Sequence, residues 1–153
     1  MSAANVPNAG WKSTSGALLI YEHDLDQVKD VLCTLLAECQ ARCALLICRR
    51  DGALIWQQGD IGSLDTTSLA ALAAAGFAAT KEIASLIGEP EFSVLFHQGK
   101  SEHLHLNLIS DDVLMMLLFD DRTTIGLVRV LARDASQQLT GILDTTTNNS
   151  NPG

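Results

Sequence analysis

The sequence predicts an α/β fold, a three-layer sandwich in which a five-stranded antiparallel sheet lies between one long helix and two terminal helices. The order of the predicted elements supports this fold: helix, two strands, helix, three strands, helix. Short turns join neighbouring strands, which favours antiparallel pairing. The size also agrees, because 153 residues, 47% of them apolar, suit one hydrophobic core. We place this domain at residues 21–144, after a flexible arm (1–20) and before a disordered tail (145–153).

The first helix is expected at residues 24–40, because apolar side chains recur there every three or four positions and form one stripe. Asp24 is the expected N-cap of this helix. A hairpin should follow, with strands at 44–48 and 53–58 and an Asp51-Gly52 turn between them.

The longest predicted element is a helix that begins at Thr66 or Thr67, extends to Leu86 and is ended by Gly88. One apolar stripe of this helix is expected to face the sheet. It consists of Leu69, Leu72, Ala73, Gly76, Thr80, Ile83 and Ile87.

Three strands are expected next, at residues 92–97, 104–109 and 113–119. The last of them is apolar on both faces, so it should lie at the centre of the sheet. In the middle strand, leucines alternate with polar residues, which predicts that one face of this strand is exposed to solvent. The polar residues are His103, His105 and Asn107.

The chain should end its fold with a helix that is capped by Thr124. Its buried stripe is expected to consist of Val128, Leu131, Ala135, Leu139 and Ile142.

The far side of the long central helix is also apolar, and its only charged residues are Lys81 and Glu82. A helix that is apolar on nearly all sides is buried on nearly all sides, whereas the sheet of a small domain can cover only one of them. We therefore expect a partner chain on this face, and arginine at Ala74 or Ala78 should weaken its binding and leave the fold intact. Alternatively, alanine is used here only for its helix propensity. The residues expected at the interface are Ala70, Ala71, Ala74, Ala75, Phe77, Ala78, Lys81 and Glu82.

Three separated segments resemble bacterial MglB-like members of the roadblock (dynein light chain) family. They are DTTSLA at 65–70, LIGE at 86–89 and FDDRTTIGLVR at 119–129, and they agree with the family in order and spacing. The resemblance covers roughly residues 24–143 and implies a roadblock-like fold. It also implies a homodimer in which the long helices are adjacent and the third strands pair into one continuous sheet. By this resemblance the interface also includes Phe92, Val94 and Phe96.

The resemblance further implies a function, that of a dimeric, non-catalytic regulator of a Ras-like small GTPase of the MglA type. Such a GTPase-activating partner repositions the residues of the GTPase and donates no catalytic arginine. Lys81 and Glu82 depart from the pattern of small residues in MglB-like helices, so the contact geometry can differ. An alternative with the same fold is a homodimeric scaffold that has no effect on GTP hydrolysis. Arg122 could in principle serve as an arginine finger, but an ion pair with a nearby aspartate is the default expectation.

Composition and charge argue against several other classes of protein. A net charge of −8 disfavours nucleic-acid binding, which depends on lysine and arginine at the phosphates. We expect no membrane insertion, since no apolar run approaches the roughly 20 residues of a spanning helix. The N-terminal stretch lacks the pattern of a secretion signal, so we expect a cytoplasmic protein.

We expect neither a cofactor nor a catalytic site, and hence no enzyme. The Gly99-Lys100-Ser101 sequence lacks the spacing of a phosphate-binding loop. The four cysteines form no Cys-x-x-Cys pair and are expected to be reduced and mostly buried thiols. The remaining alternative is a metal-dependent enzyme built around His97, His103 and His105, although no acidic residue or cysteine completes an obvious ligand set.

Overall fold

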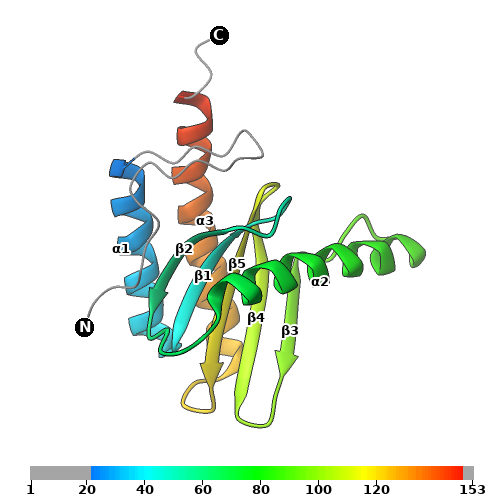
Figure 1. Ribbon diagram of the computed structural model, residues 1–153, viewed down its shortest axis with the longest axis horizontal. Coiled ribbons are helices and arrows are strands. Elements are labelled where there is room, and N and C mark those ends of the chain that lie inside the picture. The colour runs from blue at the N-terminus through cyan, green and yellow to red at the C-terminus, as the bar shows by residue number, and fades with distance from the viewer. Residues whose placement is uncertain (1–21, 150–153) are drawn as a thin grey trace.

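The computed structural model describes residues 22–149 and has the predicted three layers (Figure 1). The elements follow the predicted order. They are α1 (Glu22–Cys39), β1 (Cys43–Cys48), β2 (Leu54–Gly59), α2 (Thr66–Leu86), β3 (Val94–Gln98), β4 (Glu102–Ser110), β5 (Val113–Asp120) and α3 (Ile125–Asn149).

The five strands form one sheet in the order β2-β1-β5-β4-β3, and all neighbouring pairs are antiparallel. β5 lies at the centre, as its two apolar faces predict. β3 lies at one edge and pairs only with β4, so its other side is free within the described part of the chain.

Two apolar cores hold the layers together. The first lies between the sheet and the antiparallel pair α1 and α3, and includes Leu46, Met115 and Leu139, all fully buried. The second lies between the other face of the sheet and α2, and includes Leu45, Leu114 and Phe77. Because helices cover both faces of the sheet, the apolar residues on either side of β5 are buried away from water.

The predicted helix starts are correct for two of the three helices. Asp65 caps α2, where its Oδ1 accepts a hydrogen bond from the Ser68 N–H at 3.0 Å. Thr124 caps α3 by accepting a bond from the Leu127 N–H at 3.2 Å. The Asp24 prediction is wrong, because α1 begins earlier, at Glu22, and Asp24 is buried within the helix.

The ends of the predicted domain meet the limits of the described structure. α3 continues to Asn149 and so includes part of the segment 145–153 that the sequence predicts as a tail. The predicted arm at 1–20 and the last residues, 150–153, lie outside the described residues.

The predicted solvent-exposed face of β4 is wrong. His103, His105 and Asn107 are at most 6% exposed, because this face of the strand is turned toward the α3 layer. Alternation of polar and apolar residues indicated two different faces correctly, but it could not show that a helix also covers the polar one.

Candidate functional site

α2 packs on the sheet through small side chains and one aromatic ring. Ala70, Ala74 and Phe77 are 0%, 6% and 1% exposed and belong to the core beneath the helix. The predicted role of these three residues at a partner interface is therefore wrong, since no surface remains for another chain. Alanine lets the helix backbone approach the strands closely, and the ring of Phe77 fills the remaining space.

Arg49, at the end of β1, fixes the position of α2 from the side. Its guanidinium lies 5.6 Å from the centre of the Phe77 ring, and its Nη2 is 2.6 Å from Oε2 of Glu91 in the segment that follows α2. The β1–β2 turn also touches the helix, where Gly52 has a φ of 71° and a Cβ at this position would lie 2.9 Å from the Ala71 Cα. The turn thus requires glycine both for its backbone conformation and for this close approach.

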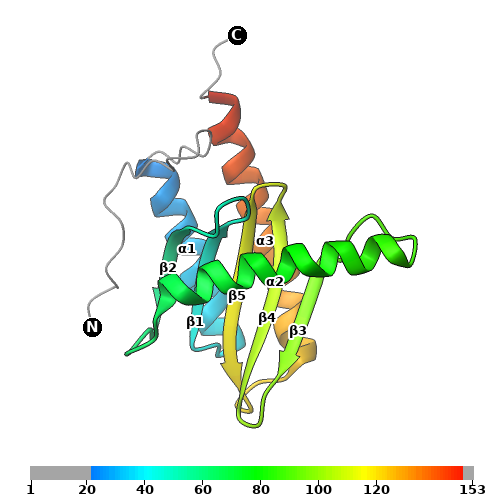
Figure 2. The same cartoon turned by 45° about the vertical axis from the view of Figure 1, so that its right-hand side comes forward.

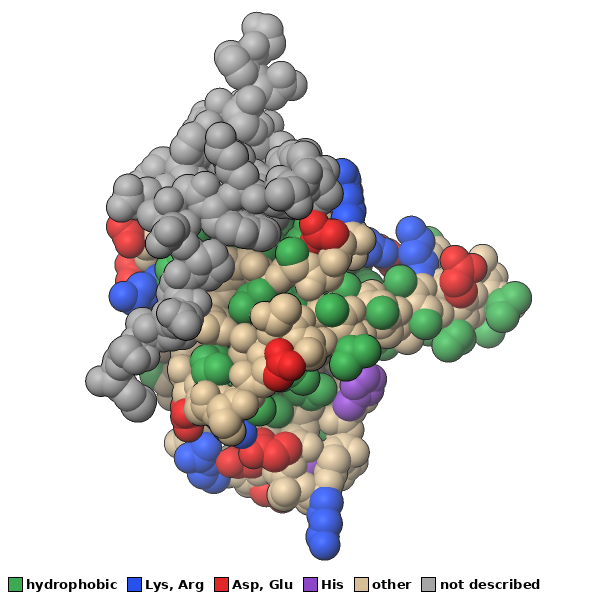
Figure 3. Space-filling model, viewed as in Figure 1, with side chains coloured by type: hydrophobic (Ala, Val, Ile, Leu, Met, Phe, Trp, Pro, Cys, Tyr) green, Lys and Arg blue, Asp and Glu red, His purple; other side chains and the backbone are tan. Residues whose placement is uncertain are grey.

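The apolar stripe that was predicted to face the sheet is largely exposed. Leu72 is 71% exposed and Ile83 53%, while Leu86 and Ile87 at the end of the helix are 87% and 65% exposed. Large apolar side chains that lie together on a surface indicate a binding site more often than scattered ones do. Figure 3 shows such side chains in a row along α2, with a few charged groups near its C-terminal end.

The exposed residues arise from a mismatch between α2 and the sheet. Figures 1 and 2 show that α2 runs across the sheet and that its C-terminal turns extend past β3, where no strand lies beneath them. Periodicity in the sequence did not indicate that the following residues lie at the surface: Leu72, Gly76, Ile83, Leu86 and Ile87. The length of the helix, 21 residues or about 30 Å, was the available signal, because it exceeds the width of the few strands that it crosses.

An apolar groove separates α2 from the β3 edge of the sheet. Its volume is about 220 Å³, and its walls are mostly apolar. On the helix side it is lined by Leu69, Leu72, Ala73, Gly76, Phe77 and Thr80, and on the sheet side by Leu95, His97, Leu104, Leu106 and Met116. The predicted inward stripe therefore faces this open groove along much of its length.

The free edge of β3 lies beside this groove. The Ser93 carbonyl accepts a hydrogen bond from the Leu108 N–H, so in this antiparallel ladder Leu95 and His97 also direct their backbone groups toward β4. The backbone groups of Val94 and Phe96 consequently point away from β4, toward the free side. Such an edge can accept a strand from another chain.

Side chains on the α3 side hold β3 in place. The Phe96 ring stacks on Phe119 with the ring centres 6.0 Å apart, and His103 packs against both rings. His103 Nε2 is 2.8 Å from Oδ1 of Asp121, and its Nδ1 accepts a bond from the Gly99 N–H at 3.2 Å. Even so, Val94 and Phe96 remain 41% and 39% exposed at the edge.

The remaining residues of the predicted interface are accessible. Ala71, Ala75, Ala78, Lys81 and Glu82 are exposed on α2, and Phe92 is half-buried in the segment before β3. Together with Leu72, Gly76, Ile83, Leu86, Ile87, Val94 and Phe96, these residues are called the α2–β3 surface below.

The three histidines do not converge on a metal site. His97 lines the groove on the α2 side of the sheet, whereas His103 and His105 lie on the opposite face. Both ring nitrogens of His103 already have partners. Within residues 22–149 no three side chains of the metal-binding kinds come together.

Two other candidate groups also have structural roles. Arg122 forms an ion pair with Asp120, as the default expectation held, with its Nε 3.0 Å from Oδ1, and this contact lowers the pKa of Asp120. The four cysteines are free thiols, but Cys33 is exposed and the other three are buried. Burial raises the pKa of Cys43 to about 11, so this thiol stays protonated and unreactive near neutral pH.

By length and composition, α2 could cross a membrane, and the expectation that no segment could do so was wrong in this respect. The helix nevertheless packs on the sheet of its own domain through Ala70, Ala74 and Phe77. Its exposed side also carries Lys81 and Glu82, which are costly in a lipid interior. We interpret its apolar side as a surface for another protein.

The comparisons with known proteins agree with the fold. The model of the Roadblock/LC7 domain matches residues 29–119. MglB from Myxococcus xanthus is 36% identical over 78% of this chain and 96% of that chain, with a TM-score of 0.74. The gliding protein MglB from Thermus thermophilus is 30% identical over 84% and 97% of the two chains, with a TM-score of 0.79. A structure described as MglB with tetrameric arrangement is 30% identical over 84% and 96%, with a TM-score of 0.80. No match was found among the curated proteins.

Proposed function

The chain belongs to the Roadblock/LC7 domain family, and we propose that it is a dimeric, non-catalytic regulator of a Ras-like small GTPase of the MglA type. Its resemblance to MglB proteins supports a role in the regulation of a small GTPase. The more specific proposal is that it acts as a GTPase-activating partner.

The exposed apolar side of α2 is the main support for this proposal. Leu72 and Ile83, together with the small residues around them, offer an apolar helix face that the domain's own sheet leaves uncovered. A specific interface typically covers about 800 Å² on each partner, so the proposed contact uses both α2 and the adjacent strand β3.

The proposed homodimer uses the neighbouring edge. A second copy adds its β3 to the free side of β3, through the outward backbone groups of Val94 and Phe96. The same arrangement brings a second α2 toward the groove of about 220 Å³ and covers its apolar walls. Two α2 helices then form one broad surface for the GTPase.

The proposed activity requires no catalytic group from this chain. Arg122 forms an ion pair with Asp120, and it would have to break this ion pair to act as an arginine finger. We therefore propose that the α2–β3 surface repositions catalytic residues of the GTPase itself. We also propose a cytoplasmic location, in which the apolar side of α2 meets protein and not lipid.

The experiment measures GTP hydrolysis by a purified MglA-type GTPase with and without this protein, and binding by titration calorimetry. We expect binding only to the GTP-loaded form and faster hydrolysis at saturation. Binding without acceleration would instead support the homodimeric scaffold. An absence of binding to any nucleotide state, with no change in the hydrolysis rate, would contradict the proposed regulation of the GTPase.

A matched pair of variants locates the contact. Leu72→Arg places a long charge on the exposed side of α2, and we expect it to weaken GTPase binding at least about tenfold, because a buried unpaired charge is strongly unfavourable. Leu127→Arg makes the same change at a 44% exposed residue of α3, on the other side of the sheet. The α3 variant should bind as the unmodified protein does. Equal effects of the two variants would place the contact elsewhere.

A further inference from the structure

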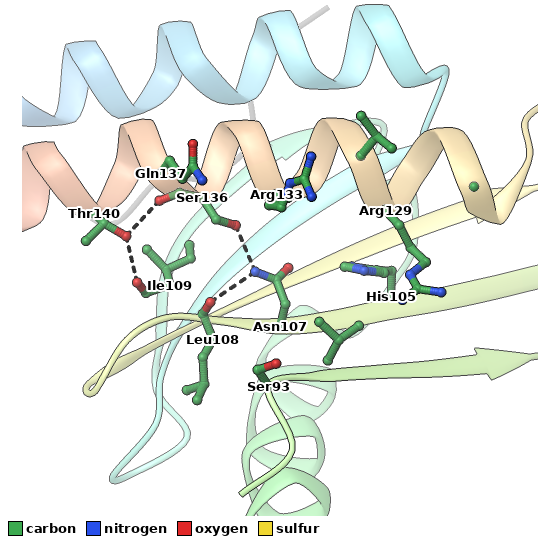
Figure 4. Close-up of a pocket in the computed structure, with 13 residues that line it drawn as sticks. Ser93, His105, Asn107, Leu108, Ile109, Arg129, Arg133, Ser136, Gln137 and Thr140 are labelled. Atoms are coloured by element: carbon green, nitrogen blue, oxygen red, sulfur yellow. Dashed lines mark hydrogen bonds between the residues drawn. The ribbon is translucent and has the colours of Figure 1, made fainter.

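A second cavity lies on the other side of the sheet from α2, between β4 and α3. Its volume is about 650 Å³, within the range of small-molecule sites. Figure 4 shows how α3 supplies one wall, while the side chains of β4 rise from the floor and Ser93 lies at the β3 end.

Two buried polar side chains at the floor are incompletely paired. His105 is 2% exposed, and neither of its ring nitrogens has a hydrogen-bond partner in the described chain. Asn107 is 5% exposed; its Nδ2 donates to Ser136 Oγ at 2.8 Å and to the Leu108 carbonyl at 3.1 Å, but its Oδ1 has no partner among the same residues. Buried polar groups nearly always have partners, so these atoms indicate a partner from outside the described chain, either ordered water or a bound molecule.

The wall from α3 carries unpaired positive charge. Arg129 and Arg133 both line the cavity, and one helical turn separates them on the same side of α3. Like charges at this spacing destabilise a helix. The other arginines of the described structure, Arg42, Arg49, Arg50 and Arg122, each pair with a carboxylate, whereas no ion pair involves these two. This exception occurs in a chain with a net charge of −8, where acidic partners are plentiful.

We propose that this cavity binds a small organic anion, whose phosphate or carboxylate group lies at Arg129 and Arg133 and whose hydroxyl groups pair with His105 and Asn107. Guanidinium groups bind such anions through paired charge-assisted hydrogen bonds. A hydroxyl group can donate to Asn107 Oδ1 and can exchange hydrogen bonds with an imidazole.

The protonation state of His105 favours a hydroxyl group over a second anionic group as its hydrogen-bond partner. Burial and, to a lesser extent, the charge of Arg129 lower the pKa of His105 to about 4, so the ring is neutral near pH 7. A neutral imidazole offers one donor and one acceptor nitrogen, and both are unused here. The ligand therefore combines an anionic end at α3 with a neutral polar end at β4.

The proposal does not depend on the function assigned to the α2–β3 surface. The cavity lies on the α3 face of the sheet and the groove beside α2 on the other face, and only Val94 belongs to both the cavity and the α2–β3 surface, so ligand binding and GTPase binding can be measured and can fail separately.

Binding is tested on the full chain with two probes, glycerol 3-phosphate and glycerate, each of which combines one anionic group with two hydroxyl groups. Isothermal titration calorimetry at constant ionic strength gives the affinities, and the ring signals of His105 in NMR spectra report contact at the floor. We expect at least one probe to bind saturably and to shift these signals. The tighter probe identifies the anionic group as phosphate or carboxylate.

A charge-matched pair of double variants provides the control. Arg129→Gln with Arg133→Gln should weaken binding at least about tenfold, since each guanidinium contributes charge-assisted hydrogen bonds. Lys29→Gln with Lys100→Gln removes the same charge at exposed residues outside both the cavity and the α2–β3 surface and should leave binding unchanged. The proposal is overturned if neither probe binds, if the lysine variant loses as much affinity as the arginine variant, or if binding leaves the His105 signals unmoved.

Discussion

Burial determines the chemistry of His105 at the scale of the single residue. The side chain lies on β4 beneath α3 and is 2% exposed, so its protonation would place a charge in a poorly solvated site beside Arg129. Burial is the larger cause of its lowered pKa, about 4, and the arginine adds to it. The ring is therefore neutral in the folded protein and becomes charged on unfolding at mildly acidic pH.

This difference predicts that His105 makes stability dependent on pH. The unfolded chain binds a proton below about pH 6.5 and the folded chain only below about pH 4, so the free energy of unfolding falls as the pH decreases between these values. From pH 7 to pH 5 we expect this loss to be roughly 2 kcal/mol. Urea unfolding without added ligand should show it, and His105→Gln should show a correspondingly flatter dependence. Parallel curves for the two proteins would refute this assignment.

Two large apolar residues of α2 differ widely in their exposed fraction, and they should differ in their contribution to stability. Phe77 is 1% exposed and contacts Arg49, and Phe77→Ala should lower the free energy of unfolding by about 3–5 kcal/mol because it leaves a cavity. Leu72 is 71% exposed in the single chain, and Leu72→Ala should change the stability of the monomer by about 0.5 kcal/mol or less. Chemical denaturation at a protein concentration low enough to keep the chain monomeric measures both. A large effect at Leu72 under these conditions would contradict its exposure in the single chain.

At the scale of the element, α2 shows what periodicity can and cannot predict. The predicted start at Thr66 and the predicted end near Gly88 follow from local chemistry and are correct, and the structure shows Asp65 as the N-cap. The buried side was assigned to the stripe with Leu72 and Ile83, but Ala70, Ala74 and Phe77 occupy it. A helix that is apolar all round has no contrast between its sides, so the side that packs depends on the shape of the sheet, which sequence periodicity does not contain.

Adjacent arginine substitutions test this orientation. Ala74→Arg inserts a long charged side chain into the core between α2 and the sheet, where Ala74 is 6% exposed, and should lower stability by roughly 3 kcal/mol or more. The sequence-based expectation that this variant keeps its fold is thus revised. Ala75→Arg, one residue along and exposed, should retain a native circular dichroism spectrum and cooperative unfolding while it weakens association. Equal stability of the two variants would show that the helix is rotated about its axis.

At the scale of the whole molecule, the layers and the central place of β5 were predictable, because each strand's apolar pattern reports how many of its faces are covered. The groove beside α2 and the cavity beneath α3 were less predictable from the sequence. The groove depends on how far α2 extends past β3, and the cavity depends on α3 covering a polar face of β4. Both arise from the packing of elements that are distant in sequence. The accessible residues of the predicted interface, from Ala71 to Phe96, lie on α2, on the edge strand β3 and in the segment between them, and their role at an interface stays a prediction.

The proposed assembly of two molecules through β3 depends on backbone hydrogen bonds at the free edge of this strand. If two β3 strands pair, Val94 must donate its outward backbone N–H to the partner, and proline at this residue removes that donor. The β3–β4 ladder does not use this N–H, and proline is tolerated on edge strands whose N–H groups face outward. Val94→Pro should therefore retain a folded monomer but shift sedimentation from dimer toward monomer, whereas Val94→Ala should remain dimeric because it keeps the donor. A fully dimeric Val94→Pro protein would show that the copies associate through α2 without continuing the sheet.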